Sequence, residues 1–271
     1  MSEAGSLRVL LVGAGKMGGA MLGGWLANGI RPENVTVLDP GPPPEMAALI
    51  AEKGIALNPD TSDAPDVAVV AVKPQVMDEV LPKAVRHFGP RTLLVSVAAG
   101  KTIANLARHA GSTRPIVRAM PNTPAAIGRG MSVLVANDHA SPAERETATR
   151  LLSACGKTAW IEDEALMDAV TAVSGSGPAY VFHLAECMAK AGEAAGLDPE
   201  LAMLLARETV QGAGELLHQS PEEPATLRKN VTSPGGTTAA ALSVLMGDDG
   251  LEKLMREAVA AAKKRGQELG G

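Results

Sequence analysis

Three glycines near the N-terminus have the spacing of a phosphate-binding loop. Gly13, Gly15 and Gly18 form GxGxxG directly after the apolar run Leu7 to Val12 and at the start of a helical pattern. In such a loop the first glycine permits a tight turn, the second lets the backbone approach a pyrophosphate, and the third lets the helix pack close to its strand. A purely structural loop could carry the same glycines, but the position on the first strand of a βαβ pattern favours a dinucleotide site. The loop residues are Gly13, Ala14, Gly15, Lys16, Met17 and Gly18.

An acidic residue ends the next apolar run. Asp39 follows Val35 to Leu38, about twenty residues beyond the last glycine, where a carboxylate would accept hydrogen bonds from the adenosine ribose of a dinucleotide. The same carboxylate repels a 2′-phosphate, and the loop from Pro40 to Glu45 contains no Arg or Lys. The local pattern therefore predicts acceptance of NADH and does not favour NADPH, unless Asp39 merely begins a turn with Pro40.

A second segment that could do chemistry lies near the C-terminus and reads TSPGGTT, from Thr232 to Thr238. Its Pro-Gly-Gly turn opens a helix and leaves several backbone N–H groups free together, an arrangement that binds carboxylates. Composition alone favours an ordinary helix start that is capped by Ser and Thr, so the segment by itself leaves both interpretations open. Its candidate substrate-binding residues are Ser233, Gly235, Gly236, Thr237 and Thr238.

No pattern indicates a metal site, a nucleophile or a nucleic-acid partner. Cys155 and Cys187 lack any CxxC or Cys/His ligand spacing, and two cysteines cannot build a disulfide framework, which favours a reducing cytoplasm. A net charge of −5 and only two Trp, one Tyr and two Phe make nucleic acid a poor partner. The apolar run Val67 to Val72 is far too short to cross a bilayer. We expect no signal peptide, because the first apolar run leads into the glycine motif and not into a cleavage site.

These groups need a scaffold, and 271 residues with 46% hydrophobic content suffice for a large core. From Leu7 to about Ile161, short apolar runs alternate with helical stretches, one of which opens with a capping box at Ser141 and Glu144. The predicted strands are Leu7 to Val12, Val35 to Leu38, Val67 to Val72, Thr92 to Val97, Pro115 to Met120, Ser132 to Ala136 and Lys157 to Ile161. We therefore expect an α/β fold with an N-terminal Rossmann-type, doubly wound, mostly parallel sheet over residues 1–162.

After the last predicted strand only helical patterns of Ala, Leu, Met and Glu remain. One helix opens with Asp198 as N-cap and Pro199 at its first position, and another opens at Ser220. The pattern predicts an all-α domain over residues 163–271. Helices such as Ala239 to Met246 are apolar on more than one face, so we expect this domain to be buried against another subunit.

Several further segments have distinctive sequences. They are AVKP (Ala71 to Pro74), AAG (Ala98 to Gly100), RAMPNTP (Arg118 to Pro124) and SGSGPAY (Ser174 to Tyr180). AVKP and AAG end predicted parallel strands, at the edge where open α/β sheets bind ligands. Together with TSPGGTT, these segments resemble the pyrroline-5-carboxylate reductase family in order and spacing, over nearly the whole chain.

The resemblance implies roles for single residues. Cofactor binding would extend beyond the glycine loop and Asp39 to Asn58, Ala71, Val72, Lys73, Pro74, Ala98, Ala99, Gly100, Asn122 and Asn230. Thr238 would be the catalytic residue and hydrogen-bond the substrate's ring nitrogen, while the amides near Gly236 and Thr237 hold its carboxylate. Asn122 and Glu164 would also lie near the substrate. Without the resemblance, Lys73 fits a solvated charge at a strand end equally well.

The reaction that the resemblance implies is reduction of L-1-pyrroline-5-carboxylate to L-proline by hydride from NADPH or NADH, the last step of proline biosynthesis. A cyclic imine is basic enough to be protonated from water near neutral pH, so the enzyme's task is mainly positioning. Family members intertwine their C-terminal helices, which implies a homodimer at least, or a larger ring of dimers, with an active site completed at the subunit contact.

Two alternatives remain open. One is another small-imine or 3-hydroxy-acid oxidoreductase of the same two-domain architecture. The hydroxy-acid enzymes place a catalytic Lys four residues after a helical glycine motif and an Asn four residues later, but Gly177 is followed there by Val181 and Ala185. The other is a non-catalytic dinucleotide-binding module, which would have no reason to carry TSPGGTT.

Overall fold

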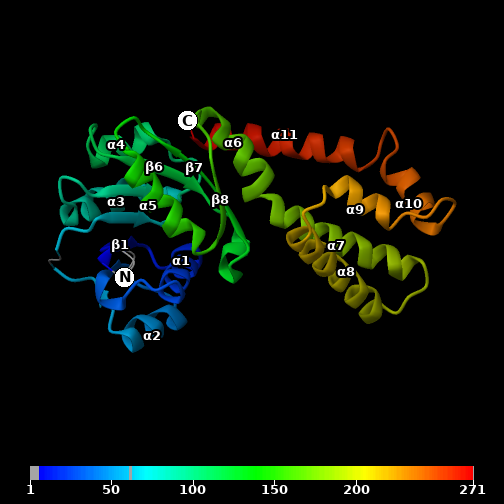
Figure 1. Cartoon of the computed structure of the whole chain (residues 1–271), viewed down its shortest axis with the longest axis horizontal. Helices are drawn as coiled ribbons and strands as arrows, with labels where there is room; N and C mark the ends of the chain where they lie inside the picture. Colours follow the sequence, from blue (N-terminus) through cyan, green and yellow to red (C-terminus); the bar gives the residue numbers. More distant parts are fainter. Residues whose placement is uncertain (1–5, 61–62, 271) are drawn as a thin grey trace. The chain divides into compact units, whose positions relative to one another are not determined.

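The structure, a computed structural model, describes residues 6–60 and 63–270. The chain divides into two compact units (Figure 1). The first, here called the sheet unit, runs up to Gly175 and takes in the C-terminal segment from Lys263, and the second, the helical unit, spans Ser176–Ala262. The predicted domain boundary at residue 162 follows the last strand closely, but residues 164–175 pack with the sheet unit. The division into a dinucleotide-binding domain over residues 1–162 and a substrate-binding and dimerisation domain over residues 163–271 stays a prediction.

Within the described residues, eight strands form one sheet in the order β3-β2-β1-β4-β5-β6-β7-β8. They are β1 (Val9–Val12), β2 (Val35–Leu38), β3 (Ala56–Leu57), β4 (Val67–Val70), β5 (Leu93–Ser96), β6 (Ile116–Met120), β7 (Gly130–Ala136) and β8 (Gly156–Trp160). Neighbouring strands are parallel except β6 and β7. The strand order reverses beside β1, which makes the switch point where doubly wound sheets bind ligands. The predicted fold class is confirmed.

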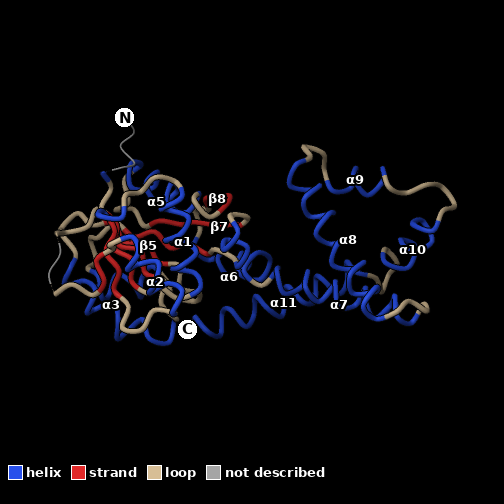
Figure 2. The backbone as a smooth tube through the Cα atoms, turned by 90° about the horizontal axis from the view of Figure 1, so that it is seen from below, coloured by secondary structure: helices blue, strands red, loops and turns tan. Residues whose placement is uncertain are grey.

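Helices cover both faces of this sheet, as Figure 2 shows with the strands in red. Val9 and Leu11 face one side, where they join a core with residues of α1 (Lys16–Ala27), α2 (Pro44–Lys53) and α5 (Pro142–Ser153). Leu10 and Val12 face the other side, towards α3 (Met77–Ala84) and α4 (Ile103–Ala110). Because both faces are covered, β1 is apolar at every position, and its end is rigidly placed.

The remaining helices carry most of the second half of the chain. They are α6 (Met167–Val170), followed by a π-helical turn (Thr171–Gly175), α7 (Gly177–Ala194), α8 (Pro199–Gln219), α9 (Pro224–Asn230), α10 (Thr237–Leu245) and α11 (Leu251–Gly270). The predicted cap of α8 is confirmed, because Asp198 accepts hydrogen bonds from the amides of Glu200 and Leu201.

Two local predictions were wrong. The sheet has one strand more than the seven predicted, because β3 is two exposed residues long and gives no apolar pattern. The helix expected at Ser220 begins instead at Pro224, with Glu223 as N-cap. A helix that started at Pro221 would need the N–H of Pro224 to bond the Ser220 carbonyl, and proline has none.

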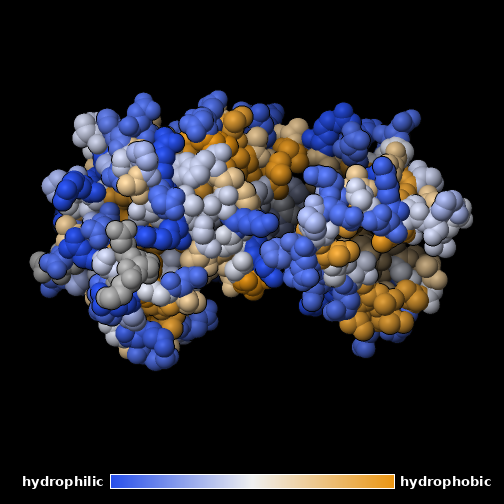
Figure 3. Space-filling model, in the orientation of Figure 1, coloured by the Kyte–Doolittle hydropathy of each residue, from blue (hydrophilic) through white to orange (hydrophobic). Residues whose placement is uncertain are grey.

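The helical unit has little core of its own. Its fully buried apolar residues are the three small side chains Ala189, Ala202 and Ala206. Large apolar side chains are exposed instead, among them Phe182 at 65%, Leu204 at 55% and Val244 at 74%. Figure 3 shows such residues in orange on the surface of this unit. In the described part of the chain, every helix is too short or too polar to span a membrane.

Candidate active site

The three glycines of the glycine loop have three different surroundings. Gly13 has φ +92°, and a Cβ there would lie 2.8 Å from Val72 Cγ1. A Cβ on Gly18 would collide with the Gly13 carbonyl oxygen, whereas one on Gly15 would meet nothing within 4 Å. The turn and the helix packing thus need glycine, and Gly15 leaves the backbone open to a ligand. Helix α1 starts at Lys16 without a side-chain cap, so its first amides suit the pyrophosphate of a dinucleotide.

Asp39 lies at the end of β2, as predicted, but its carboxylate is bound by the protein. Its Oδ2 accepts a hydrogen bond of 2.7 Å from the Ala14 amide, and its Oδ1 accepts one of 2.8 Å from the Gly41 amide. The side chain of Asn58, a residue with φ +50°, holds the backbone N–H and carbonyl of Asp39 at 2.9 and 2.7 Å. Asp39 therefore braces the glycine loop through the Ala14 amide, and Asn58 holds the backbone of Asp39. Their contacts with a cofactor stay predictions.

The AVKP segment adjoins the glycine loop. The Ala71 amide donates to the Val12 carbonyl at 2.8 Å, and Ala71 and Val72 are the groups nearest to Gly13. Lys73 is exposed and precedes a short 3₁₀ turn that begins at Pro74. The structure thus brings together segments that the sequence separates by more than fifty residues, at the carboxyl ends of β1 and β4.

A pocket of about 400 Å³ lies beside the AAG loop, within the range of ligand-binding cavities. Three predicted cofactor residues, Pro74, Ala99 and Gly100, line it. The other lining residues are Gln75, Lys101, Asp168, Thr171, Gly266 and Leu269. The end of α11 supplies the last two, which could not be predicted because their pattern is typical of an ordinary solvated helix.

The AAG loop leads into α4 and is held on one side by an ion pair. Lys101 Nζ lies 3.1 Å from Asp78 Oδ2, and His109 Nε2 lies 3.1 Å from Asp78 Oδ1. These hydrogen bonds hold the pKa of Asp78 below its ordinary value. Asp78 therefore stays ionised near neutral pH and keeps Lys101 in place.

Glu164 holds the same loop from its other end. Glu164 Oε1 accepts a hydrogen bond of 2.7 Å from Arg118 Nη1 and one of 2.9 Å from the Ile103 amide, the first residue of α4. Arg118 lies on β6 and is buried. A second pocket of about 380 Å³ is lined by both residues together with Gly100, Thr102, Ala165, Asp168 and Gln267. Arg118 lies within RAMPNTP, but the sequence did not single it out, because no local pattern reveals a partner 46 residues away.

Asn122 is also engaged by the protein. Its Oδ1 accepts a hydrogen bond from the Met131 amide, and its Nδ2 lies 3.2 Å from the carbonyl and 3.3 Å from the hydroxyl of Ser174. Gly175 approaches so closely that a Cβ would lie 2.5 Å from Met120 Cε. The MPNTP and SGSG segments therefore lie against each other, and Asn122 joins them. Contacts of Asn122 with ligands stay predictions.

The TSPGGTT segment lies in the helical unit and forms the predicted turn and helix start. Gly235 has φ +70°, and the Gly236 amide donates to the Ser233 carbonyl at 3.0 Å. Helix α10 begins at Thr237 with Gly236 as N-cap and no side-chain cap, so its first three amides have no partner within the helix. Asn230 is exposed, and its Nδ2 lies 3.2 Å from Glu222 Oε2.

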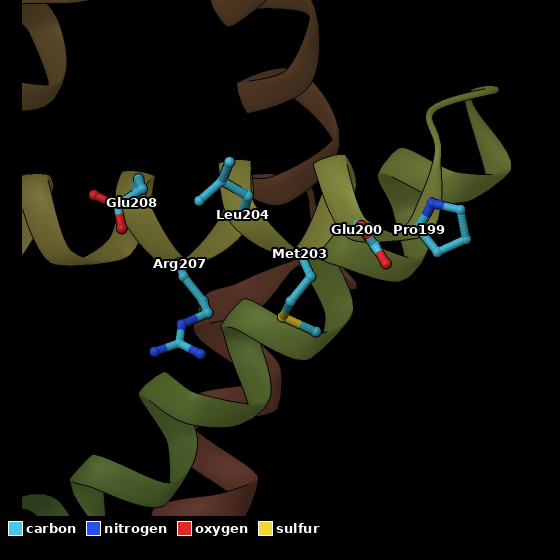
Figure 4. Close-up of a pocket in the computed structure, with 6 residues that line it drawn as sticks. All are labelled: Pro199, Glu200, Met203, Leu204, Arg207 and Glu208. Carbon is cyan, nitrogen blue, oxygen red and sulfur yellow. The ribbon is translucent and has the colours of Figure 1, made fainter.

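A hollow of about 620 Å³ on α8 contains none of the predicted site residues. Its lining, shown in Figure 4, consists of Pro199, Glu200, Met203, Leu204, Arg207 and Glu208. Met203 and Arg207 point to the same side of the helix and Leu204 points away from them. Since one helix supplies the whole lining, the hollow belongs to the exposed surface of the helical unit and does not enclose a ligand.

Neither the buried cysteine nor the acidic and histidine side chains of the described residues indicate nucleophilic chemistry at Cys155 or a metal site. Burial raises the pKa of the Cys155 thiol, which makes it a poor nucleophile. Among the described residues, no group of three or more His, Cys, Asp or Glu side chains could hold a metal ion. The arrangement fits binding and positioning of a dinucleotide and a small anionic substrate.

Comparison with known proteins agrees with this geometry. Residues 164–269 match the family model for pyrroline-5-carboxylate reductase dimerisation, and residues 8–100 match the model described as NADP oxidoreductase coenzyme F420-dependent. The pyrroline-5-carboxylate reductase of Pseudomonas aeruginosa is 43% identical over 97% of this chain and 96% of its own length. The chain belongs to the pyrroline-5-carboxylate reductase family.

Solved structures of the pyrroline-5-carboxylate reductase family share the whole architecture. The Coxiella burnetii enzyme superposes with a TM-score of 0.90 at 32% identity, over 98% of this chain and 99% of that one. The Plasmodium falciparum enzyme, whose structure has NADP bound, gives a TM-score of 0.80 at 30% identity, over 98% of this chain and 99% of its own. The similarity therefore includes both the glycine loop and the TSPGGTT segment.

Proposed function

We propose that this protein reduces the C=N bond of L-1-pyrroline-5-carboxylate with a hydride from NADH or NADPH and releases L-proline, the last step of proline biosynthesis. The observation that carries the proposal is the full-length similarity to pyrroline-5-carboxylate reductases, which covers both the glycine loop and the TSPGGTT segment. The open face at Gly15 and the uncapped start of α10 supply the two kinds of anion site that this reaction needs.

The sheet unit would hold the cofactor. The amides at the start of α1 would bind the pyrophosphate, and the pocket beside Ala99 and Gly100 has room for the nicotinamide end. When bound, the reduced nicotinamide supplies the hydride. The relative from Plasmodium falciparum binds NADP, whereas Asp39 favours NADH by charge, so we propose that both cofactors are accepted.

The TSPGGTT segment would hold the substrate. The free amides of α10 would bind the carboxylate, and the Thr238 hydroxyl would hydrogen-bond the ring nitrogen. The imine takes its proton from water, the hydride adds to the ring carbon of the C=N bond, and the product is a secondary amine with oxidised cofactor. The residues contribute chiefly by orienting the two reactants. Glu164 and Asn122 would lie near the substrate.

We further propose a homodimer at least, with a ring of dimers as its larger form, located in the cytoplasm. The match of residues 164–269 to a dimerisation model supports the dimer, as does the exposed apolar surface of the helical unit. Hydride transfer requires that the nicotinamide of a bound cofactor lie next to the substrate that a TSPGGTT segment holds. The cofactor site and the TSPGGTT segment could belong to one chain or to two chains of the dimer.

The test is a set of assays on the purified protein. With L-1-pyrroline-5-carboxylate we expect loss of reduced-cofactor absorbance and formation of proline in equal amounts. Oxidation of a 3-hydroxy acid with NAD⁺, and no reaction with the imine, would favour the hydroxy-acid alternative, although Val181 occupies the position of its catalytic Lys. Cofactor binding without any turnover would favour a non-catalytic module.

A further inference from the structure

We propose that Glu164 is a positioning residue, which the buried Arg118 orients so that it fixes the start of α4 and thereby the AAG loop at the nicotinamide end of the site. This inference rests on the proposed function and changes the role of Glu164 from a substrate neighbour to a support of the cofactor loop.

The contacts of the Glu164 carboxylate carry the proposal. One oxygen accepts from two donors at once, Arg118 Nη1 at 2.7 Å and the Ile103 amide at 2.9 Å. The side chain of Glu164 is 29% exposed and that of Arg118 is 7% exposed. A charged side chain as buried as Arg118 requires a partner, and it limits the carboxylate to one orientation. Glu164 is therefore held firmly before any ligand binds.

The Ile103 amide has no hydrogen-bond partner within its own helix, and Glu164 accepts its hydrogen bond. Helix α4 has a local capping box, in which Thr102 Oγ1 accepts from the Asn105 amide and the Asn105 side chain returns to Thr102. This box leaves the amide of Ile103, the first residue of the helix, without a local partner. The carboxylate satisfies it from 61 residues away in the sequence and adds a favourable interaction with the helix dipole.

The loop between β5 and α4 is thus tied at two points. Asp78 holds Lys101 on one side and Glu164 holds Ile103 on the other. Between the strand and these anchors lie Ala98, Ala99 and Gly100, the residues proposed for the nicotinamide end. Loss of the Glu164 anchor should loosen this loop while the rest of the sheet, which is buried on both faces, keeps its structure.

The first experiment measures amide hydrogen exchange in the cofactor-free protein. In Glu164→Ala we expect exchange in peptides that cover residues 98–106 to rise about tenfold or more, with peptides from β1 and β4 unchanged. Glu164→Gln retains an oxygen for the Ile103 amide, so its exchange should rise less. Glu162→Gln is the matched control, because the Glu162 side chain is 86% exposed and its Oε2 lies 3.9 Å from Arg145 Nη1, at the outer limit of an ion pair. Exchange in residues 98–106 should not change in this variant.

The second experiment separates positioning from substrate contact. A loosened loop should lower kcat about tenfold, weaken cofactor binding measured by nicotinamide fluorescence, and raise the isotope effect with cofactor deuterated at the transferred position, because hydride transfer becomes rate-limiting. The KM for the imine should stay within about twofold of wild type. If Glu164→Ala unfolds, Glu164→Gln provides the same measurements at a smaller amplitude.

The proposal is overturned if loop exchange in both Glu164 variants equals that of wild type, or if the KM for the imine rises tenfold while cofactor affinity and the isotope effect do not change. Failure of the proposed function is a separate result, since wild-type protein would then not reduce the imine at all. The exchange experiment does not depend on turnover and tests the anchor in either case.

Discussion

The proposed ligand-binding segments of the sheet unit and of the helical unit are supported in opposite ways. In the sheet unit the proposed cofactor residues are braced by the protein itself, as when Asp39 bonds the glycine loop and Glu164 bonds the start of α4. In the helical unit the TSPGGTT turn is largely exposed, and the fully buried apolar residues of that unit are three alanines. The sheet unit is organised by its own core, whereas we propose that a partner subunit covers the exposed apolar side chains of the helical unit.

The largest effect should come from placing a charge on the exposed apolar surface of the helical unit. Leu204→Glu would bury an unpaired carboxylate in the dimer, which costs about 3 to 5 kcal/mol and weakens association by about two to nearly four orders of magnitude. Light scattering at micromolar concentration should detect monomers with little activity. Ile127→Glu, at a residue 77% exposed in the sheet unit, is the control and should leave the mass of the assembly unchanged. If the two variants have the same mass and the same activity, the exposed apolar surface of the helical unit is not the dimer interface.

A smaller loss is expected at the substrate loop. Thr238→Ala removes one hydroxyl and keeps the free amides of α10. A hydrogen bond to a charged group contributes roughly 1.5 to 3 kcal/mol, so kcat/KM for the imine should fall by about one to two orders of magnitude. Cofactor binding should barely change, because the sheet unit holds the dinucleotide. Thr237→Ala, which contributes mainly its backbone N–H, is the control, and a wild-type kcat/KM in Thr238→Ala would remove Thr238 from the mechanism.

Two glycines of one loop should respond differently in the sheet unit. Gly18→Ala places a methyl group against the Gly13 carbonyl and should destabilise the cofactor-free protein by about 1 to 3 kcal/mol. Gly15→Ala points into open space, so its thermal midpoint should match wild type while its cofactor affinity falls. Thermal unfolding and fluorescence titration of both variants test this. A destabilised Gly15→Ala would contradict the assigned geometry.

The sequence was sufficient where the signal is local. The bounds of β2 are those predicted, since a four-residue apolar run ends at Asp39, and Asp198 with Pro199 located the start of α8. It was insufficient where long-range packing decides. Spacing placed Asp39 at the strand end but could not tell that its carboxylate faces the Ala14 amide. The contacts of Arg118 with Glu164, and of Gly266 with Asp168, join segments that no periodicity connects.

The smallest effect concerns the choice of cofactor, and it depends on what holds Asp39. Its two carboxylate oxygens accept from Ala14 and Gly41, so the residue both braces the glycine loop and supplies a negative charge at the end of β2. Asp39→Ser removes the charge, which should raise the kcat/KM with NADPH relative to NADH by relieving repulsion of the 2′-phosphate. It also removes the brace, so affinity for both cofactors should fall.

Asp39→Asn separates the two contributions, because the amide keeps one oxygen for the Ala14 N–H but carries no charge. We expect Asp39→Asn to change the NADPH to NADH ratio as much as Asp39→Ser does, by about three- to tenfold, with a smaller loss of affinity for either cofactor. Such a change corresponds to about 0.7 to 1.4 kcal/mol, as expected for a charge that is partly screened by solvent. Steady-state kinetics with both cofactors give the ratio. If neither variant changes it, Asp39 acts only as a brace, and the selectivity of this family member must be set elsewhere in the sheet unit.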